Sequence, residues 1–218
     1  MKTVALSEAH RRHLAALRGV PAIVDAEGLR IGRQFVMFFA ETELMRKHAV
    51  RLTAHVERAH VLEVGLGLGV FAEQLTTLNV ASYTAIEPHP GVARLAHERV
   101  LSAFPAPAAV LTDPWQQAAL PTGAFDAIMY DTWPPDGRAD NDFAEFVEHV
   151  AIPCLRSGGR FSFFHSGATI GGARREVLDR YFPGWTADPY TMPAALVPPH
   201  WTKPTRDFLI PIATKASA

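Results

Sequence analysis

The sequence predicts an α/β fold in which helices cover both faces of a mostly parallel sheet. Through most of the chain, short apolar strand segments alternate with segments of helical apolar spacing, which is typical of parallel strands joined by crossover helices. A glycine-rich turn, 65–69, directly follows the first buried strand. Two late extended segments, 188–197 and 207–212, are separated only by a Pro-rich loop, so we expect them to pair as a C-terminal antiparallel hairpin.

The individual elements follow from the spacing of apolar residues and from the residues that interrupt it. A short helix capped by Ser7 is expected near the N-terminus. The further helices are expected at about 42–58, 70–78, 92–100 and 143–150. The expected strands are 61–64, 83–86, 109–111, 125–130 and 160–164. We therefore expect an N-terminal helical segment, 1–58, that covers the active site, and a domain, 59–218, that forms one structural unit.

Composition excludes several classes of protein. A chain of 218 residues fits one ordinary domain. With 21 basic and 22 acidic groups the formal net charge is −1, which removes the sequence-wide electrostatic case for nucleic acid or an anionic membrane as the main partner. The one cysteine, Cys154, excludes an internal disulfide framework and a Cys-rich metal site. No apolar run approaches the roughly 20 residues that cross a bilayer, and no signal peptide is visible, so we expect a cytoplasmic location.

The glycine-rich turn and the acids near it indicate a ligand site. In open parallel sheets, ligands bind beyond the carboxyl ends of the strands. Gly65, Gly67 and Gly69 let the backbone turn sharply and come close to a bound nucleotide. Glu87 ends the next strand about 20 residues later, where a carboxylate can accept both hydroxyls of a ribose.

Two cofactors compete for this turn, and a tight turn without a ligand is the third interpretation. A dinucleotide site expects a third glycine where Val70 stands, so that the helix N-terminus can receive a pyrophosphate. Glu63, just before the turn, would also put a carboxylate close to a diphosphate. An acid there suits S-adenosylmethionine better, because that cofactor has no phosphate and carries ammonium and sulfonium groups.

At these residues the chain resembles the class I S-adenosylmethionine-dependent methyltransferases, and in particular the guanidinoacetate N-methyltransferase family and its arginine-methylating relatives. Segment 61–67 is similar to the first motif of that family. Segment 125–134, in which Tyr-Asp-Thr precedes an aromatic residue and a proline, resembles its fourth-strand region. Segments 156–160 and 195–199 resemble the turn into its fifth strand and its C-terminal strand. The resemblance covers about residues 31–215 and implies a Rossmann-like fold.

The resemblance implies a set of cofactor-binding residues, to which the carboxylate argument adds Glu63. The set is Met37, Met45, Gly65, Leu66, Gly67, Leu68, Gly69, Val70, Phe71, Glu87, Pro88, His89, Trp115, Gln116 and Asp131. Trp115 could cover one face of the adenine ring while the Gln116 amide reaches its edge. An ordinary, partly buried aromatic residue is the alternative for Trp115, and a plain loop residue for His89.

The resemblance also implies the residues that hold and activate the substrate. Glu41 and Asp131 are the implied guanidino-binding and catalytic acids, and Ser166 with Gly167 would hold the carboxylate of the substrate. Carboxylates hold a planar guanidinium best when they meet it edge-on with two parallel hydrogen bonds. The alternatives are a helix N-terminal acid for Glu41, a turn-capping aspartate for Asp131 and a flexible loop at 166–167.

The chain departs from the family in two places. Gly171 and Gly172 stand where substrate-facing residues are expected, and no tryptophan precedes Trp115, whereas the family has an early tryptophan that helps to cover the cofactor.

The expected function is transfer of a methyl group from S-adenosyl-L-methionine to the guanidino group of a small molecule, such as free arginine or guanidinoacetate. The product would be S-adenosyl-L-homocysteine, and no metal is expected. The alternatives are a protein arginine N-methyltransferase and a small-molecule O- or C-methyltransferase. A nicotinamide oxidoreductase and a cofactor-binding subunit without activity fit the residues less well. Neither nucleic acid nor membrane is an expected partner. The apolar residues of the N-terminal segment could cover the active site or pack against a second subunit in a homodimer.

Overall fold

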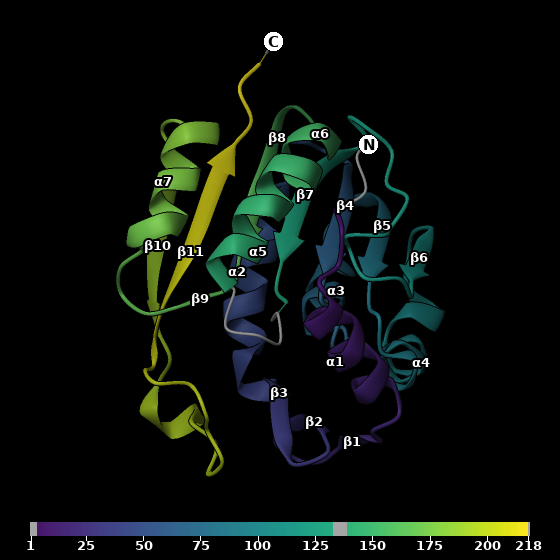
Figure 1. The fold of residues 1–218 in the computed structure, drawn as a ribbon. Coiled ribbons are helices and arrows are strands. Elements are labelled where there is room, and N and C mark those ends of the chain that lie inside the picture. Colours follow the sequence, from purple (N-terminus) through teal and green to yellow (C-terminus); the bar gives the residue numbers. More distant parts are fainter. Residues whose placement is uncertain (1–3, 133–138, 218) are drawn as a thin grey trace.

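The computed structural model describes residues 4–132 and 139–217, so Trp133 and Pro134, which the resemblance includes, lie outside the described residues. Within these ranges the centre of the fold is an eight-stranded sheet with the order β10-β11-β8-β7-β4-β5-β6, in which β9 pairs with β11 (Figure 1). Its strands are β4 (Ala59–Val64), β5 (Val80–Ile86), β6 (Ala108–Leu111), β7 (Phe125–Tyr130), β8 (Leu155–Phe163), β9 (His165–Ser166), β10 (Thr186–Thr191) and β11 (Asp207–Thr214).

The sheet confirms the predicted mixture of parallel and antiparallel pairs. β4, β5, β6, β7 and β8 run parallel to their neighbours among these strands, whereas β11 is antiparallel to both β8 and β10. The chain proceeds from β4 outward to β5 and β6, and then from β7 outward to β8 on the other side. The strand order therefore reverses between β4 and β7, and ligands of open α/β sheets bind at such a switch point.

Helices cover both faces of the sheet (Figure 1). They are α2 (Thr42–Thr53), α3 (Val70–Leu75), α4 (Pro90–Arg99), α5 (Ala139–Phe146), α6 (Ile152–Cys154) and α7 (Gly172–Tyr181), with a π-helical turn at Val147–Ala151. Alternate strand residues face opposite cores, as the pleat requires. Val61 and Met129 pack with α2 and α3, whereas Leu62 and Ile128 pack with α5.

The prediction of a helical segment over residues 1–58 is wrong for residues 22–38. The helix α1 (Glu8–Arg18) and α2 are present, but three antiparallel strands lie between them: β1 (Ala22–Val24), β2 (Gly28–Ile31) and β3 (Gln34–Phe38). Gly28 permits the close β2–β3 approach, because a Cβ there would lie 2.0 Å from the carbonyl oxygen of Met37. Strands of three to five residues are too short to give a clear periodic signal.

Other differences concern the ends of elements. α2 ends at Thr53 rather than at 58, and α3 ends at Leu75 rather than at 78. The extended segment predicted over 188–197 is a strand only to Thr191, and Ala194–Leu196 forms a 3₁₀ turn. The helix α7 was not predicted, because Leu178 is the one fully buried residue in it and gives no apolar stripe.

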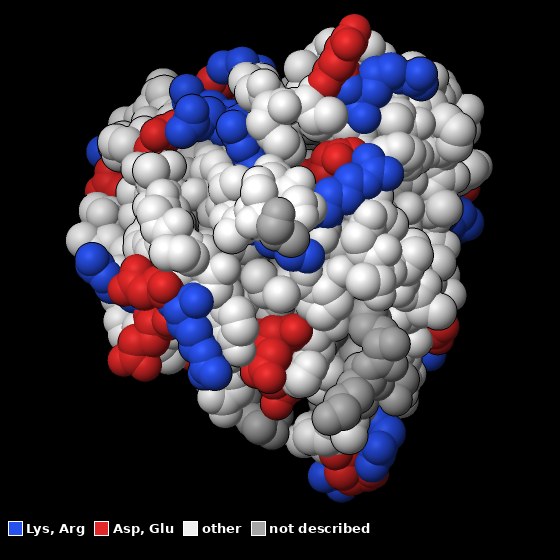
Figure 2. Space-filling model, turned by 90° about the horizontal axis from the view of Figure 1, so that it is seen from above, with Lys and Arg blue, Asp and Glu red and all other residues white. Residues whose placement is uncertain are grey.

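Charges of both signs are interspersed on the face that Figure 2 shows, and neither sign forms a continuous patch there. Among the described residues, no helix combines the length and the apolar character that crossing a bilayer requires.

Candidate active site

The turn after β4 brings three glycines to the switch point. Gly65, Gly67 and Gly69 have φ angles of +93°, +51° and +74°, which L side chains rarely adopt. A Cβ on Gly65 would lie 1.8 Å from the carbonyl oxygen of Asp131. The Asp131 N–H donates to the carbonyl oxygen of Val64 at 2.8 Å. The glycine turn and the predicted catalytic acid therefore meet backbone to backbone at one edge of the sheet.

Glu87 reaches this turn from the end of β5. Its Oε2 accepts a hydrogen bond from the Gly67 N–H at 3.3 Å, and its Oε1 accepts one from the His89 N–H at 2.9 Å. Burial raises the pKa of this carboxyl to about 7. Glu87 therefore lies beside the glycine turn, and its contact with ribose hydroxyls stays a prediction.

Glu63 adds a second buried acid on the same edge. The Tyr83 hydroxyl donates a hydrogen bond to its Oε2. Burial raises the pKa of Glu63 well above its usual range, and the charges of Asp131 and Glu87 raise it further, although the Tyr83 hydrogen bond lowers it. Glu63 therefore lies near enough to Asp131 and Glu87 for their charges to shift its pKa, and a site with these acids favours a positively charged ligand over a diphosphate.

The N-terminal strands also reach the turn. The Met37 sulfur would lie 3.3 Å from a Cβ placed on Gly67, so β3 packs against the glycine turn. Arg18 of α1 donates to the carbonyl oxygen of Pro88 at 3.0 Å. His89 caps α4: its Nδ1 accepts the Val92 N–H, and its Nε2 donates to the carbonyl oxygen of Val20 at 2.9 Å. Residues from the first 40 positions thus contact both the glycine turn and the segment 88–89 that follows β5.

Several predicted cofactor contacts are side chains of the hydrophobic cores. These buried residues are Met45, Leu66, Leu68, Val70 and Phe71. The apolar side chains at 66–71 are buried in the hydrophobic cores, where they hold the turn and α3 in place. A contact between this segment and a ligand must therefore come from its backbone. The role of Met45 as a direct contact stays a prediction.

Trp115 and Gln116 follow β6, and both bond to Asp142 of α5. The Trp115 indole N–H donates to Oδ2 of Asp142 at 3.3 Å, and the Gln116 amide NH₂ donates to Oδ1 at 3.0 Å. Tyr130 also donates to Oδ2 of Asp142. The Trp115 ring is buried and packs edge-on against Phe146, 5.3 Å between ring centres, so its stacking on adenine stays a prediction.

The amide of Gln116 is left with one spare acceptor. Its Oε1 is buried and has no hydrogen-bond partner. Because Asp142 fixes the NH₂ end, this oxygen is oriented to accept a hydrogen from an amino group such as that of adenine. Asp142 was not among the predicted site residues; its sequence signal is an acid beside Phe143 on the buried face of a helix.

Glu41 is buried at the end of a 3₁₀ turn, Phe39–Glu41, directly before α2. Its Oε2 accepts the Phe38 N–H at 3.0 Å, whereas its Oε1 is buried without a hydrogen-bond partner. The Lys203 Nζ lies 3.7 Å from that Oε1. Burial raises the pKa of Glu41, and the Lys203 charge opposes this shift. One carboxylate oxygen thus caps the 3₁₀ turn, and the other is left for a cation.

Asp131 belongs to the same electrostatic group. Burial raises its pKa to about 7, the charge of Lys203 lowers it, and the charge of Glu41 raises it. Glu41 and Asp131, predicted from segments 90 residues apart, therefore lie within reach of one cation. Lys203, which completes the group, was not predicted, because a lysine in a Pro-rich loop has no distinguishing pattern.

The predicted carboxylate-binding pair is only partly suited to that role. The Ser166 hydroxyl is buried without a hydrogen-bond partner and can donate to a ligand. The N–H of Gly167, however, already donates to the carbonyl oxygen of Asp207 at 2.7 Å, in the pairing of β9 with β11. The structure therefore leaves the hydroxyl, and not this N–H, for a substrate carboxylate.

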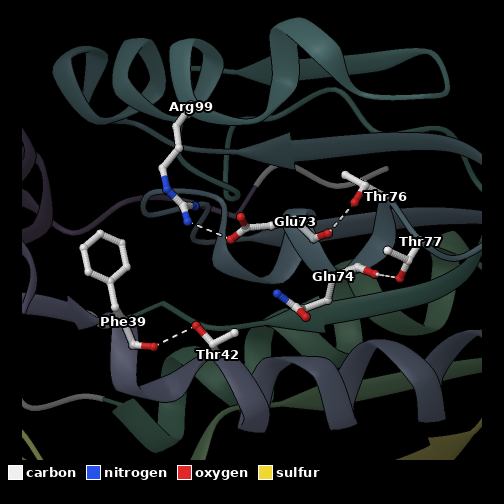
Figure 3. A pocket seen from close by; sticks show the side chains of 7 residues that line it. All are labelled: Phe39, Thr42, Glu73, Gln74, Thr76, Thr77 and Arg99. Atoms are coloured by element: carbon white, nitrogen blue, oxygen red, sulfur yellow. Dashed lines mark hydrogen bonds and ion pairs between the residues drawn. The ribbon is translucent and has the colours of Figure 1, made fainter.

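A surface pocket of about 610 Å³ lies outside these residues (Figure 3). It is lined by Phe39, Thr42, Glu73, Gln74, Thr76, Thr77 and Arg99. Arg99 spans it, donating to Glu73 at 2.7 Å and to the carbonyl oxygen of Leu68 at 3.1 Å. None of the predicted site residues lines this pocket. Among the described residues, no group of three or more His, Cys, Asp or Glu side chains is arranged to hold a metal ion.

Comparison with known proteins identifies the family. The sequence model of guanidinoacetate N-methyltransferase matches residues 22–171, more than half of the 218-residue chain. The chain belongs to this family. The match covers the glycine turn and both acids of the pair Glu41 and Asp131, so it confirms the family, and the methyltransferase class of enzyme, that the sequence motifs indicated.

The curated relatives include protein arginine N-methyltransferase 2 of Aspergillus fumigatus, 28% identical over 151 residues, and that of Yarrowia lipolytica, 30% identical over 154 residues. Each match covers 67% of this chain but 34% and 31% of the relatives, respectively. The chain thus spans about a third of the length of these relatives.

Solved structures confirm the fold. The N-methyltransferase NodS from Bradyrhizobium japonicum WM9, in complex with S-adenosyl-L-homocysteine, superposes with a TM-score of 0.60 at 14% identity, covering 94% of this chain and 97% of that one. The tRNA (m1A58) methyltransferase TrmI from Aquifex aeolicus gives a TM-score of 0.60 at 15% identity, covering 85% and 72%. The chain has the Rossmann-like fold of class I S-adenosylmethionine-dependent methyltransferases.

Proposed function

We propose that this chain is an S-adenosylmethionine-dependent N-methyltransferase that acts on the guanidino group of a small molecule, such as free arginine or guanidinoacetate. The observation that supports the proposal is the placement of two acids near one cation: the Lys203 Nζ lies 3.7 Å from Glu41, and its charge also lowers the pKa of Asp131, which follows β7 beside the glycine turn. Two carboxylates are the groups that hold a guanidinium most specifically, because its N–H donors match carboxylate oxygens in pairs.

The residues at the switch point fit the proposed cofactor. The glycine turn leaves its backbone open to close approach, Glu87 can accept the ribose hydroxyls, and the Gln116 Oε1 can accept the adenine amino group. Three carboxyl groups there suit ammonium and sulfonium charges and oppose a dinucleotide. When bound, S-adenosylmethionine supplies a methyl group on a positively charged sulfur, which makes that carbon an electrophile.

The acid pair has two tasks in this reaction. A protonated guanidinium is a poor nucleophile, because its lone pairs are delocalised. Glu41 and Asp131 can hold its plane so that one nitrogen points at the methyl carbon. Asp131 would accept the proton that this nitrogen loses as the C–N bond forms and the methyl–sulfur bond breaks, with S-adenosyl-L-homocysteine as the leaving group. A pKa of about 7 suits a base at neutral pH. Direct transfer needs no nucleophilic Ser, Cys or His on the enzyme.

A second candidate acceptor is an arginine side chain of a protein. The relatives that bear the name protein arginine N-methyltransferase 2 match 67% of this chain, and an acid pair can hold a peptidyl guanidinium equally well.

The class of acceptor is tested by incubating the purified protein with S-adenosylmethionine and a panel of arginine, guanidinoacetate, agmatine and an arginine-containing peptide, followed by mass spectrometry. We expect a product heavier by one CH₂ from a free guanidino compound, with a kcat/KM at least roughly tenfold above that of the peptide, about 1.4 kcal/mol in transition-state binding. Faster methylation of the peptide would instead support the second candidate. Cofactor binding without methylation of any compound in the panel would remove the guanidino assignment.

The reaction rate is expected to depend on pH through Asp131. The base must be ionised, and burial raises its pKa to about 7, so kcat/KM for the acceptor should rise from about pH 6 to pH 8 and then level off. The pKa of Glu87 lies in the same range, so the cofactor must be kept saturating at every pH. A rate that is constant from about pH 5.5 upward would contradict Asp131 as the base.

A further inference from the structure

Lys203 brings a positive charge to the acid pair from the C-terminal part of the chain. Its Nζ lies 3.7 Å from the Glu41 Oε1 and 4.6 Å from the centre of the Phe164 ring. We propose that Lys203 is the resident cation of the acid pair and that a guanidinium substrate binds by displacing it. This inference rests on the proposed function, because it concerns the same two acids.

The geometry of the Lys203 contact favours displacement over a shared site. The Glu41 Oε1 is buried and receives no hydrogen bond, and 3.7 Å is too long for Lys203 to provide one. A guanidinium can donate two parallel hydrogen bonds to a carboxylate, which an ammonium cannot match. If both cations stayed, they would repel each other beside the same oxygens. The better donor should therefore take the place of the ammonium group.

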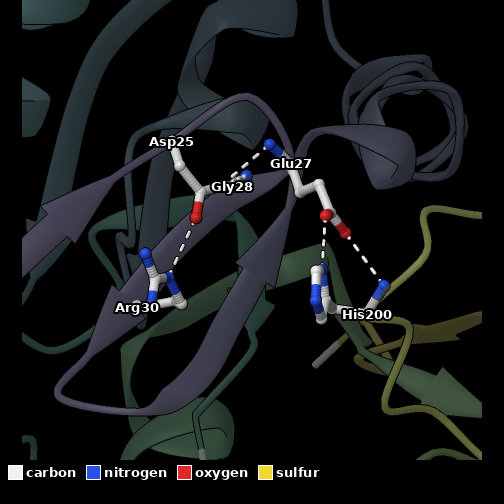
Figure 4. Close-up of polar contacts among 5 residues, drawn as sticks. All are labelled: Asp25, Glu27, Gly28, Arg30 and His200. Atoms are coloured by element: carbon white, nitrogen blue, oxygen red, sulfur yellow. Dashed lines mark hydrogen bonds and ion pairs between the residues drawn. The ribbon is translucent and has the colours of Figure 1, made fainter.

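The loop that carries Lys203 is anchored immediately before it. His200 bonds to Glu27 twice, through Nδ1 at 2.6 Å and through its backbone N–H at 3.1 Å (Figure 4). The Trp201 ring packs against Phe38 of β3, 5.0 Å between ring centres. These contacts fix the backbone of the loop on the N-terminal strands, so the displacement needs only the lysine side chain to move.

The structure gives this side chain a place to go. About a quarter of the Lys203 side chain is exposed, at 26%, whereas the Glu41 side chain is 3% exposed. Lys203 also borders a pocket of about 340 Å³, whose other lining residues include Pro204 and Asp207. The lysine stem can rotate toward this open side, and Glu41 remains in place because the Phe38 N–H holds it.

Two substitutions at this position have opposite expected effects. Lys203→Met removes the competing cation, so guanidinium ion and agmatine should bind about tenfold more tightly than to the unchanged protein. Lys203→Arg places a guanidinium on the chain itself, so it should weaken the binding of both ligands relative to the unchanged protein. Calorimetric titration of all proteins at the same pH of 8.5 measures both, because alkaline pH favours the ionised form of the two acids, whose pKa values Lys203 lowers. Lys47→Met, which removes an exposed partner of Glu43, is the matched control and should bind as the unchanged protein does.

The order of affinities separates this proposal from other roles. Rescue by Lys203→Arg, with loss in Lys203→Met, would overturn it, because it would show that Lys203 supports the site. Weaker binding of guanidinoacetate to Lys203→Met, with guanidinium ion unaffected, would also overturn it and make Lys203 a carboxylate contact. Equal affinities in all proteins would overturn it as well. Lys203→Gln replaces Lys203→Met if the latter does not fold. A failure of the proposed function would be seen in a different experiment, as the absence of methylation of every compound in the panel. The order of affinities among the Lys203 variants would still decide the role of Lys203.

Discussion

Replacing Asp131 with asparagine is expected to lower turnover by about 100-fold or more, which is the lower end of what general acid–base groups contribute. Asparagine keeps the size of the side chain but cannot accept the proton that leaves the guanidino nitrogen. It also removes one of the two charges that orient the substrate. The measurement is kcat at about pH 8 with both substrates saturating, so that differences in affinity do not enter.

The matched control for this variant is Asp188→Asn. Asp188 is half exposed, pairs with Arg51 at 2.8 Å on the surface and lies in β10, away from the carboxyl edge. Because exposed ion pairs contribute little, this variant should retain normal turnover and stability. Near-normal turnover of Asp131→Asn would show that Asp131 is not the base.

The second large effect is expected for Glu41→Gln, which should weaken binding of the guanidino substrate by about 10- to 100-fold, corresponding to roughly 1.5–3 kcal/mol for a hydrogen bond to a charged group. The affinity for S-adenosylmethionine should stay the same. A glutamine oxygen can still accept the Phe38 N–H, so the turn before α2 is preserved. The measurement is calorimetric titration of each ligand.

Glu43→Gln serves as the control for Glu41→Gln. Glu43 lies in the first turn of the same helix, but it faces solvent and pairs with Arg46 and Lys47. Its replacement should change neither affinity. If Glu41→Gln weakens the binding of both ligands equally, Glu41 supports the local structure and does not hold the substrate. That result would favour the alternative interpretation of Glu41 as a helix N-terminal acid.

The parts of the site that could be predicted from the sequence are those that local patterns determine. Strands 61–64 and 125–130 are short apolar runs, and parallel strands end at one edge, so the glycine turn and Asp131 had to be neighbours. In the structure, the backbone of Gly65 lies directly against the backbone of Asp131, in agreement with that expectation. The C-terminal antiparallel pair follows from the Pro-rich loop between its two strands, which is too short to hold a crossover helix.

The parts that could not be predicted depend on contacts between distant segments. Lys203 meets Glu41 across more than 160 residues, and nothing in the Pro-rich loop indicates this contact. Asp142 bonds to Gln116 from the next helix, where an acid is equally typical of an exposed helix face. The strands at 22–38 are too short for a periodic signal and gain their stability by packing Leu29 and Met37 against the glycine turn and α4.

The central claim is that the acid pair presents a guanidino nitrogen to the methyl group of the cofactor. It is tested most directly by a reaction with S-adenosylmethionine carrying a trideuterated methyl group and the best acceptor of the panel, with the position of the label determined by tandem mass spectrometry. We expect the fragment containing the guanidino carbon and its nitrogens to carry all three deuterium atoms. A label on the amino group, the carboxylate or a carbon atom of the acceptor would contradict it.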